Sequence, residues 1–195
     1  MRWMAGLFMA LVIAGTVSVH SQQREPSPEG VASTDVGGQW IDITYGRPIL
    51  RGRTGIFGSG ADYGTKVNDG APVWRAGANT STRLKTPVPL EIGGKRVAPG
   101  EYVMLIALKS PKDWTFILTS QSWVPDFNQD NKRDLYGAYN YTPANDVTRA
   151  PMNVEGLPFA IDQLTWGFTD VTPAGGAMRI WWDKTMATVP FKIVK

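Results

Sequence analysis

The sequence predicts an all-β protein, a single antiparallel β-sandwich domain of jelly-roll-like type, with a β-barrel as the alternative. Three observations support this prediction. Apolar and polar residues alternate in several short segments, turn residues separate these segments, and no segment shows sustained helical spacing of apolar residues. The chain has 195 residues, of which 43% are hydrophobic, which is enough for one domain with a substantial core.

The alternating segments predict strands with one face on the core, because successive side chains of a strand point to opposite sides. These segments are 41–45, 114–119, 164–169 and 189–193. Residues 102–108 are apolar throughout, which is typical of a central strand covered on both faces. Gly93 and Gly94 predict a hairpin turn, since glycine tolerates positive φ. Pro190 predicts an edge position or a bulge, because proline cannot donate to a neighbouring strand.

The first 21 residues are typical of a secretory signal peptide. Arg2 precedes an apolar run over 3–14, and Val19 and Ser21 suit cleavage after residue 21. The apolar run is shorter than the roughly 20 residues that a membrane-spanning helix needs. We therefore expect a periplasmic or secreted protein that has no membrane span after cleavage.

The mature chain then has an unusual composition. Residues 22–30 are polar and proline-rich and predict a flexible leader before the domain at 31–195. His20 is the only histidine, and the chain has no cysteine. Cleavage therefore leaves neither residue type, which excludes a Ser-His-Asp triad, a Cys-His dyad and Cys/His metal sites. A net charge of +3 also argues against a strongly cationic nucleic-acid surface.

The first candidate site combines arginine with aromatic residues, where segments 45–53 and 74–79 would meet. Its candidate ligand-binding residues are Tyr45, Arg47, Trp74, Arg75, Asn79 and Tyr139. A guanidinium binds carboxylate or phosphate through paired hydrogen bonds, and an aromatic face can stack against a ring. The residue types favour the alternative, in which the arginines hold loop carbonyls and the tryptophan belongs to the core.

The second candidate is a calcium loop. Oxygen-bearing side chains occupy positions 1, 3, 5 and 9 of an EF-hand-type loop, at Asp126, Asn128, Asp130 and Asp134. The twelfth position is Gly137 in place of a bidentate glutamate, and Lys132 and Arg133 oppose a cation. A solvated surface loop is the alternative, and no other cofactor is expected.

Several motifs, in order along the chain, carry a family resemblance. They are 44–57, 73–79, 99–102, Trp114, 139–141, 146–149 and 182–185. On these motifs the chain resembles the exported bacterial family known as domain of unknown function 2911. The resemblance implies export and a β-rich fold and supplies no activity. Thr80 stands where the family usually has glutamate, which weakens a carboxylate mechanism there, and segments 66–71 and 122–134 look like insertions.

The sequence thus favours a non-catalytic exported protein that binds a small molecule, glycan or envelope component through arginine- and aromatic-bearing loops. One alternative is a carboxylate-dependent glycan hydrolase, which requires two carboxylates in one aromatic-lined cleft. Another is a structural or assembly protein whose terminal strand, 186–194, pairs with a partner as an edge strand.

Overall fold

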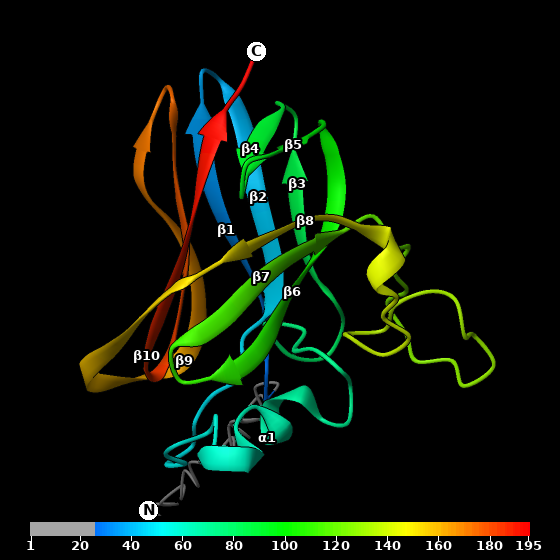
Figure 1. Ribbon diagram of the computed structural model, residues 1–195, viewed down its shortest axis with the longest axis vertical. Helices are drawn as coiled ribbons and strands as arrows, with labels where there is room; N and C mark the ends of the chain where they lie inside the picture. Colours follow the sequence, from blue (N-terminus) through cyan, green and yellow to red (C-terminus); the bar gives the residue numbers. More distant parts are fainter. Residues whose placement is uncertain (1–25) are drawn as a thin grey trace, which may run out of the picture.

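The computed structural model describes residues 26–195, and the expected signal peptide lies outside them. The regular secondary structure of the described chain is almost entirely strand (Figure 1). The strands are β1 (Glu29–Val36), β2 (Gln39–Gly46), β3 (Thr82–Thr86), β4 (Leu90–Ile92), β5 (Lys95–Val97), β6 (Gly100–Ser110), β7 (Asp113–Thr119), β8 (Asp146–Pro151), β9 (Asn153–Thr172) and β10 (Gly175–Ile193). The helical elements are α1 (Thr65–Asn68) and two short 3₁₀ turns, Gly60–Asp62 and Pro143–Asn145. Within residues 26–195, no helix has the length and apolar character needed to cross a membrane.

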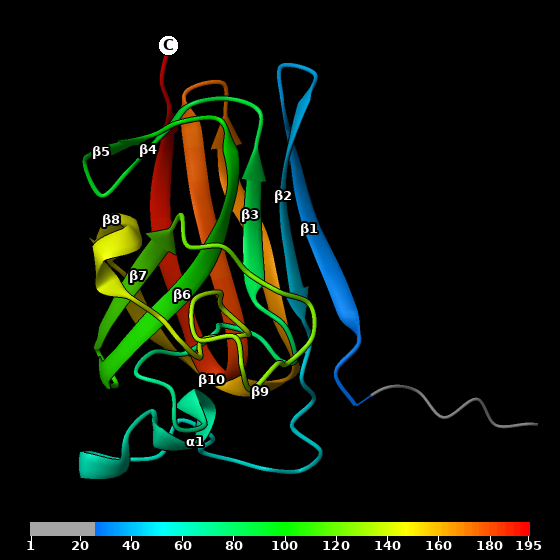
Figure 2. The same cartoon turned by 90° about the vertical axis from the view of Figure 1, so that its right-hand side faces the viewer.

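Two antiparallel sheets pack against each other. The larger sheet has the strand order β1-β2-β3-β6-β7-β8, and the smaller has the order β5-β4-β10-β9. In Figure 2 the long strands β9 and β10 lie behind β6. The sheets remain separate over the described residues, so the predicted sandwich is confirmed and the barrel alternative is not formed.

The core follows the alternation seen in the sequence. Ile41 and Ile43 of β2 are fully buried between the sheets. Strand β6 is buried on both faces, as its apolar run predicts: Met104 and Ile106 join the main core, whereas Leu105 belongs to a second cluster. Residues from 122–141 cover that second face, so the burial of β6 also fixes where this segment lies.

The turn prediction at Gly93 and Gly94 is confirmed, because these residues join β4 to β5 with φ of 59° and 75°.

The start of the domain differs from the sequence prediction. Strand β1 begins at Glu29, and Glu29 pairs with Gly46 of β2, so the last residues of the expected leader form a strand. Pairing with β2 satisfies their backbone groups, which proline-rich composition alone does not reveal.

The terminal strand is also placed differently. Pro190 predicts an edge position or a bulge, and in the strand order β10 lies between β4 and β9, so β10 is not an edge strand. Pairing with β9 ends at Thr188, and pairing with β4 begins at Lys192. Pro190 falls between these two pairings, so its missing N–H interrupts neither of them.

Candidate functional site

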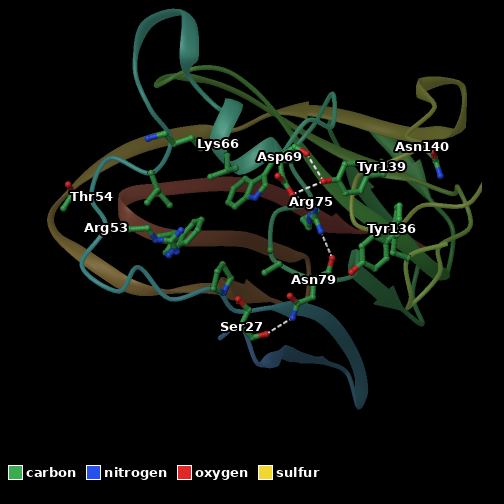
Figure 3. Close-up of a pocket in the computed structure, with 18 of the residues that line it drawn as sticks. Ser27, Arg53, Thr54, Lys66, Asp69, Arg75, Asn79, Tyr136, Tyr139 and Asn140 are labelled. Carbon is green, nitrogen blue, oxygen red and sulfur yellow. Dashed lines mark hydrogen bonds and ion pairs between the residues drawn. The ribbon is translucent and has the colours of Figure 1, made fainter. Parts of the chain in front are cut away.

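A cavity of about 1120 Å³ is the main concave feature near the predicted site (Figure 3). Four segments line it, the loops 48–56, 74–79 and 127–140 and the α1 segment 66–69, together with Ser27 and Trp182. The α1 segment lies at the end of the sandwich opposite the C-terminus (Figure 1). The cavity is therefore built from loops that the two sheets hold in place.

Two tryptophans form the buried wall of the cavity. The rings of Trp74 and Trp182 are stacked, with centroids 6.2 Å apart and an angle of 13° between their planes. They are only 1% and 5% exposed, and Phe57 packs edge-on against Trp74 at 5.5 Å. Backbone hydrogen bonds in both directions join Trp74 to Ile106 of β6. Trp74 is thus a core residue, as the alternative interpretation holds, and it also lines the cavity; its role in ligand binding stays a prediction.

The loop 74–79 has an uncommon backbone. Ala76 and Asn79 adopt φ of 51° and 62°, a region that residues other than glycine rarely enter. The carbonyl of Ala76 accepts hydrogen bonds from Nε1 of Trp166 at 2.9 Å and from Oγ1 of Thr82 at 3.3 Å. Structures keep such strained residues only where their surroundings hold them in place.

The segments 45–53 and 74–79 meet, as the site prediction requires. Gly46, at the end of β2, lies directly against the backbone of Ala78, and a Cβ at residue 46 would overlap the Ala78 carbonyl oxygen. Only glycine permits this approach, so the contact brings Pro48 and Arg53 to the same cavity as the 74–79 loop.

Arg75 is held tightly in the cavity wall. Its Nη1 donates to the carbonyl of Asn79 at 2.6 Å, and its Nη2 lies 3.8 Å from Oδ2 of Asp69. Its guanidinium carbon is 5.3 Å from the ring centroid of Tyr139. It also lies over Gly137, which has φ of 62° and where a Cβ would come within 2.7 Å of the guanidinium. The side chain is 11% exposed, so Arg75 presents a fixed positive charge at the cavity surface.

Tyr139 and Asn79 complete this wall. The hydroxyl of Tyr139 lies 2.8 Å from the carbonyl oxygen of Asp69 and 2.9 Å from its Oδ2. Burial raises the pKa of Tyr139, and the nearby Asp69 carboxylate raises it further, so the hydroxyl stays protonated at neutral pH. Asn79 donates from Nδ2 to the carbonyl of Ser27 at 3.1 Å. The structure thus gathers Trp74, Arg75, Asn79 and Tyr139 around one cavity.

Tyr45 and Arg47 lie elsewhere. The buried hydroxyl of Tyr45 donates to the Trp166 carbonyl at 3.3 Å. Arg47 reaches across to β9, donating from Nε to the Leu164 carbonyl and from Nη2 to Oγ1 of Thr165, each at 3.4 Å. Neither residue lines the cavity. Tyr45 and Arg47 therefore fit the alternative interpretation, in which such residues form hydrogen bonds inside the protein, and here they connect the two sheets.

The cavity lining is cationic. Among the lining residues that the structure describes, four are basic, Arg53, Lys66, Arg75 and Lys132, and one, Asp69, is acidic. Arg53 is engaged with backbone, donating to the carbonyls of Leu50 at 2.9 Å and Ile49 at 2.8 Å. Lys66 and Lys132 are exposed and form no ion pair with other residues of 26–195. These two ammonium groups are available to an acidic ligand.

Sequence reasoning missed both lysines, as well as Phe127 and Trp182, as cavity residues, whereas Arg53 lies at the end of the predicted segment 45–53. A single lysine in a polar segment has no local pattern that distinguishes it from an ordinary surface lysine. The one available signal was indirect, because Lys66 and Lys132 lie in the two segments, 66–71 and 122–134, that resemble insertions.

The predicted calcium loop directs several of its oxygens inward to its own donors. Oδ1 of Asn128 accepts from the Asp130 amide at 2.9 Å. Asp134 is hydrogen-bonded to Arg133 at 3.2 Å and to Asn131 at 3.0 Å, and these bonds, the Arg133 bond above all, lower the pKa of the Asp134 carboxyl. In residues 26–195, no group of three or more His, Cys, Asp or Glu is arranged to hold a metal ion. Calcium binding through Asp126 and its neighbours stays a prediction.

Comparison with known proteins gives a family. A family model described as "Protein of unknown function (DUF2911)" matches residues 27–191, and this match confirms the resemblance seen in the motifs. Neither the curated proteins nor the solved structures provide a match to the chain.

Proposed function

Because the chain belongs to the DUF2911 family, whose description gives no activity, we propose a function from the cavity itself. The protein is a non-catalytic binding protein that takes up a small acidic molecule or glycan. Export to the periplasm or the outside of the cell is part of the proposal and rests on the signal-peptide pattern at 1–21.

The charge of the cavity is the observation that carries the proposal. Four basic side chains face one carboxylate, and Asp69 is already engaged by Tyr139 and Arg75. An anion entering such a concave site is attracted more strongly than on an open surface, because the surrounding protein reduces the screening by water. A neutral ligand would gain nothing from this charge.

The size and the aromatic rings of the cavity support a ligand that contains a ring. Small-molecule sites typically enclose roughly 300–1,000 Å³, and this cavity is of that order. Phe127 and Tyr136 stand edge to face at its margin, with centroids 5.6 Å apart. Aromatic rings of this kind offer apolar contact area to one face of a sugar or another ring.

We prefer binding to hydrolysis on the basis of the carboxylates. A glycoside hydrolase uses two carboxyl groups placed on either side of the scissile bond. Asp69 is the one carboxylate in the described lining of the cavity, and it is already engaged with Tyr139 and Arg75. The arrangement therefore supports recognition of an acidic ligand more directly than bond cleavage.

A thermal-unfolding screen tests the proposal. The mature protein is mixed with galacturonic acid and sialic acid, and separately with galactose and glucose as neutral counterparts. Ligands that bind only the folded state raise Tm, and we expect a rise of at least about 2 °C with the acidic sugars alone. Equal shifts with neutral sugars, or no shift with any of the four, would contradict the proposal.

Charge-removing variants locate the binding site. The double variant Lys66→Gln/Lys132→Gln removes the two unpaired cavity cations, and we expect it to lose most of the shift. The matched control Lys85→Gln/Lys95→Gln removes two exposed lysines outside the cavity and should keep it. Retention of the full shift in the cavity variant would place binding elsewhere.

A further inference from the structure

Building on the proposed function, we infer that the ligand is an acidic oligosaccharide whose negative charges are spaced along its length, held at both ends of the cavity. The inference depends on where the cations lie, which of them have free donors, and what surrounds them.

The basic residues of the cavity are spread out. Figure 3 shows Arg53 and Lys66 on one side of the cavity, while Arg75 lies on the other side beside Tyr139. Lys132 follows Asn131, whose carbonyl accepts from Nδ2 of Asn140 at 2.8 Å, and Asn140 lies on the same side as Tyr139 in Figure 3. A site for one phosphate or one carboxylate would bring its cations to a single point. This arrangement instead suits two or more anionic groups separated along a chain.

The type of the available cations also favours a ligand with several separated anionic groups. The arginines already donate to backbone carbonyls, Arg53 to Leu50 and Arg75 to Asn79, which limits their paired binding of a ligand carboxylate. The unpaired cations are the two lysines, whose ammonium groups act as point charges on flexible stems. Such groups attract repeated charges without demanding one exact geometry.

The neighbours of these charges favour a saccharide. Phe127 is 63% exposed and is backed by Tyr136, so an aromatic surface is open at the cavity margin. The hydroxyl of Thr54 and the amide oxygens of Asn79 and Asn140 add polar groups to the lining, while the amide nitrogens of both asparagines donate to backbone carbonyls. A sugar ring presents apolar C–H groups on its faces and hydroxyls at its edges, which matches aromatic and amide groups side by side.

An acidic peptide fits the cavity less well. Extended peptides usually gain affinity by pairing their backbone with the edge of a sheet. Trp182 is the one cavity-lining residue of 26–195 that belongs to a named strand, and beside it β10 pairs with β9, at Trp181 and at Asp183. The described lining is therefore mostly loop and offers little strand edge to a peptide backbone.

Chain length is the variable that tests the inference. Isothermal titration calorimetry compares galacturonic acid with trigalacturonic acid, and sialic acid with trisialic acid, on the mature protein. We expect at least one trimer to bind about tenfold or more tightly than its monomer, which corresponds to about 1.4 kcal/mol. The gain should shrink as salt rises, since exposed charges are screened.

The two lysines are then removed one at a time. Lys66→Gln and Lys132→Gln should each weaken trimer binding about three- to tenfold, and only one of them should weaken monomer binding. Lys95→Gln, outside the cavity, should change either affinity less than about twofold. Both lysines are exposed, so we expect the variants to keep the wild-type Tm without ligand, and this is checked first.

Each failure has its own meaning. Equal affinity for monomer and trimer in both series overturns the inference and leaves a site for a single anion, so the proposed function survives. Tighter binding of a glutamate peptide of equal charge overturns the saccharide assignment in the same way. Failure of every acidic compound to bind overturns the proposed function together with the inference.

Discussion

Arg47 and Arg75 invite comparison, because each follows an aromatic residue within two positions and each is partly buried and bonded to a backbone carbonyl. Arg47 crosses from the end of β2 to the Leu164 carbonyl of β9, where it connects the two sheets. Arg75 donates within its own loop, to Asn79, and lies against Tyr139. The first region is scaffold and the second is cavity wall, although their residue types are nearly the same.

The difference lies in what surrounds each guanidinium. Arg47 lies among strands: its side chain packs against Gly30 of β1 and donates to Leu164 and Thr165 of β9. Arg75 is enclosed by loops, which hold one side of the guanidinium through Gly137 and leave the other toward the cavity. An arginine next to an aromatic residue therefore indicates, in general, a partly buried side chain that is hydrogen-bonded to the backbone. Whether it also faces a cavity depends on the strands or loops that surround it.

Gly46 is where scaffold and cavity meet, and changing it should have the largest effect on stability. A methyl group at this position would overlap the Ala78 carbonyl. We expect Gly46→Ala to lower the free energy of unfolding by about 3 kcal/mol, because the backbone on both sides must move. Urea unfolding followed by tryptophan fluorescence measures this change.

Gly156→Ala is the matched control. Gly156 lies in β9, has no positive φ, and a Cβ at this position would meet no heavy atom within 4 Å. Alanine there should change the free energy of unfolding by less than about 1 kcal/mol and in the stabilising direction. If both variants lose equal stability, the contact between residues 46 and 78 does not fix the position of the 74–79 loop.

The arginines themselves give the next largest effect. Arg75→Met should weaken binding of an acidic sugar about tenfold, or about 1.4 kcal/mol, because it removes a fixed charge from the cavity wall. Arg47→Met should leave affinity within about twofold and reduce stability by about 1 kcal/mol through its lost hydrogen bonds. Calorimetric titration measures the affinity of both variants for the acidic sugar, and urea unfolding measures their stability. An equal loss of affinity in the two variants would contradict the assignment of Arg47 to the scaffold and Arg75 to the cavity wall.

The sequence predicts the fold better than the site, for physical reasons. Alternation in 41–45 and the apolar run 102–108 report directly which faces are buried, and the structure confirms both. The placement of β10 between β4 and β9 could not be predicted, because the order of strands in a sheet depends on distant pairing. Local periodicity contains no information about it.

The candidate site could likewise be predicted only in part from local sequence patterns. The meeting of 45–53 with 74–79 was predicted, and Gly46 against Ala78 realises it. The direction of Arg47 was not predictable, because its side chain follows the position of β9. Lys66 and Lys132 reach the cavity only because their segments, far apart in the sequence, line the same cavity in the folded chain, which no single-residue signal reveals.

Two buried tryptophans, one in the scaffold and one in the cavity wall, should differ by a smaller amount in their effect on the free energy of unfolding. Trp166, in the scaffold, donates from Nε1 to the Ala76 carbonyl at 2.9 Å. Trp182, in the cavity wall, has a buried Nε1 without a hydrogen-bond partner among the described residues. Both variants to phenylalanine remove similar volume, but only Trp166→Phe loses a hydrogen bond. We expect Trp166→Phe to be about 1 kcal/mol more destabilising than Trp182→Phe in urea unfolding; the reverse order would show that the Trp182 N–H is satisfied in solution.

The smallest effect concerns two tyrosines that lie two residues apart. Burial raises the pKa of Tyr141 to about 12, and its hydrogen bond to Asp146 contributes further. Burial also raises the pKa of Tyr139 in the cavity wall. A tyrosine whose pKa is higher in the folded state is favoured there in its neutral form. Its contribution to stability is complete below pH 10, the pKa of the unfolded chain, and is lost as pH rises toward 12.

Tyr141→Phe should therefore flatten the fall in urea midpoint between pH 9 and about 11.5, relative to the wild-type protein. Phenylalanine also loses the 2.7 Å bond to Asp146, which lowers stability at every pH, so the slope with pH and not the absolute midpoint is the quantity to compare. Tyr139→Phe should flatten the slope less, since its hydroxyl lies at the cavity margin where water reaches it more readily. An unchanged slope in Tyr141→Phe would mean that the scaffold tyrosine ionises as freely in the folded protein as in the unfolded chain.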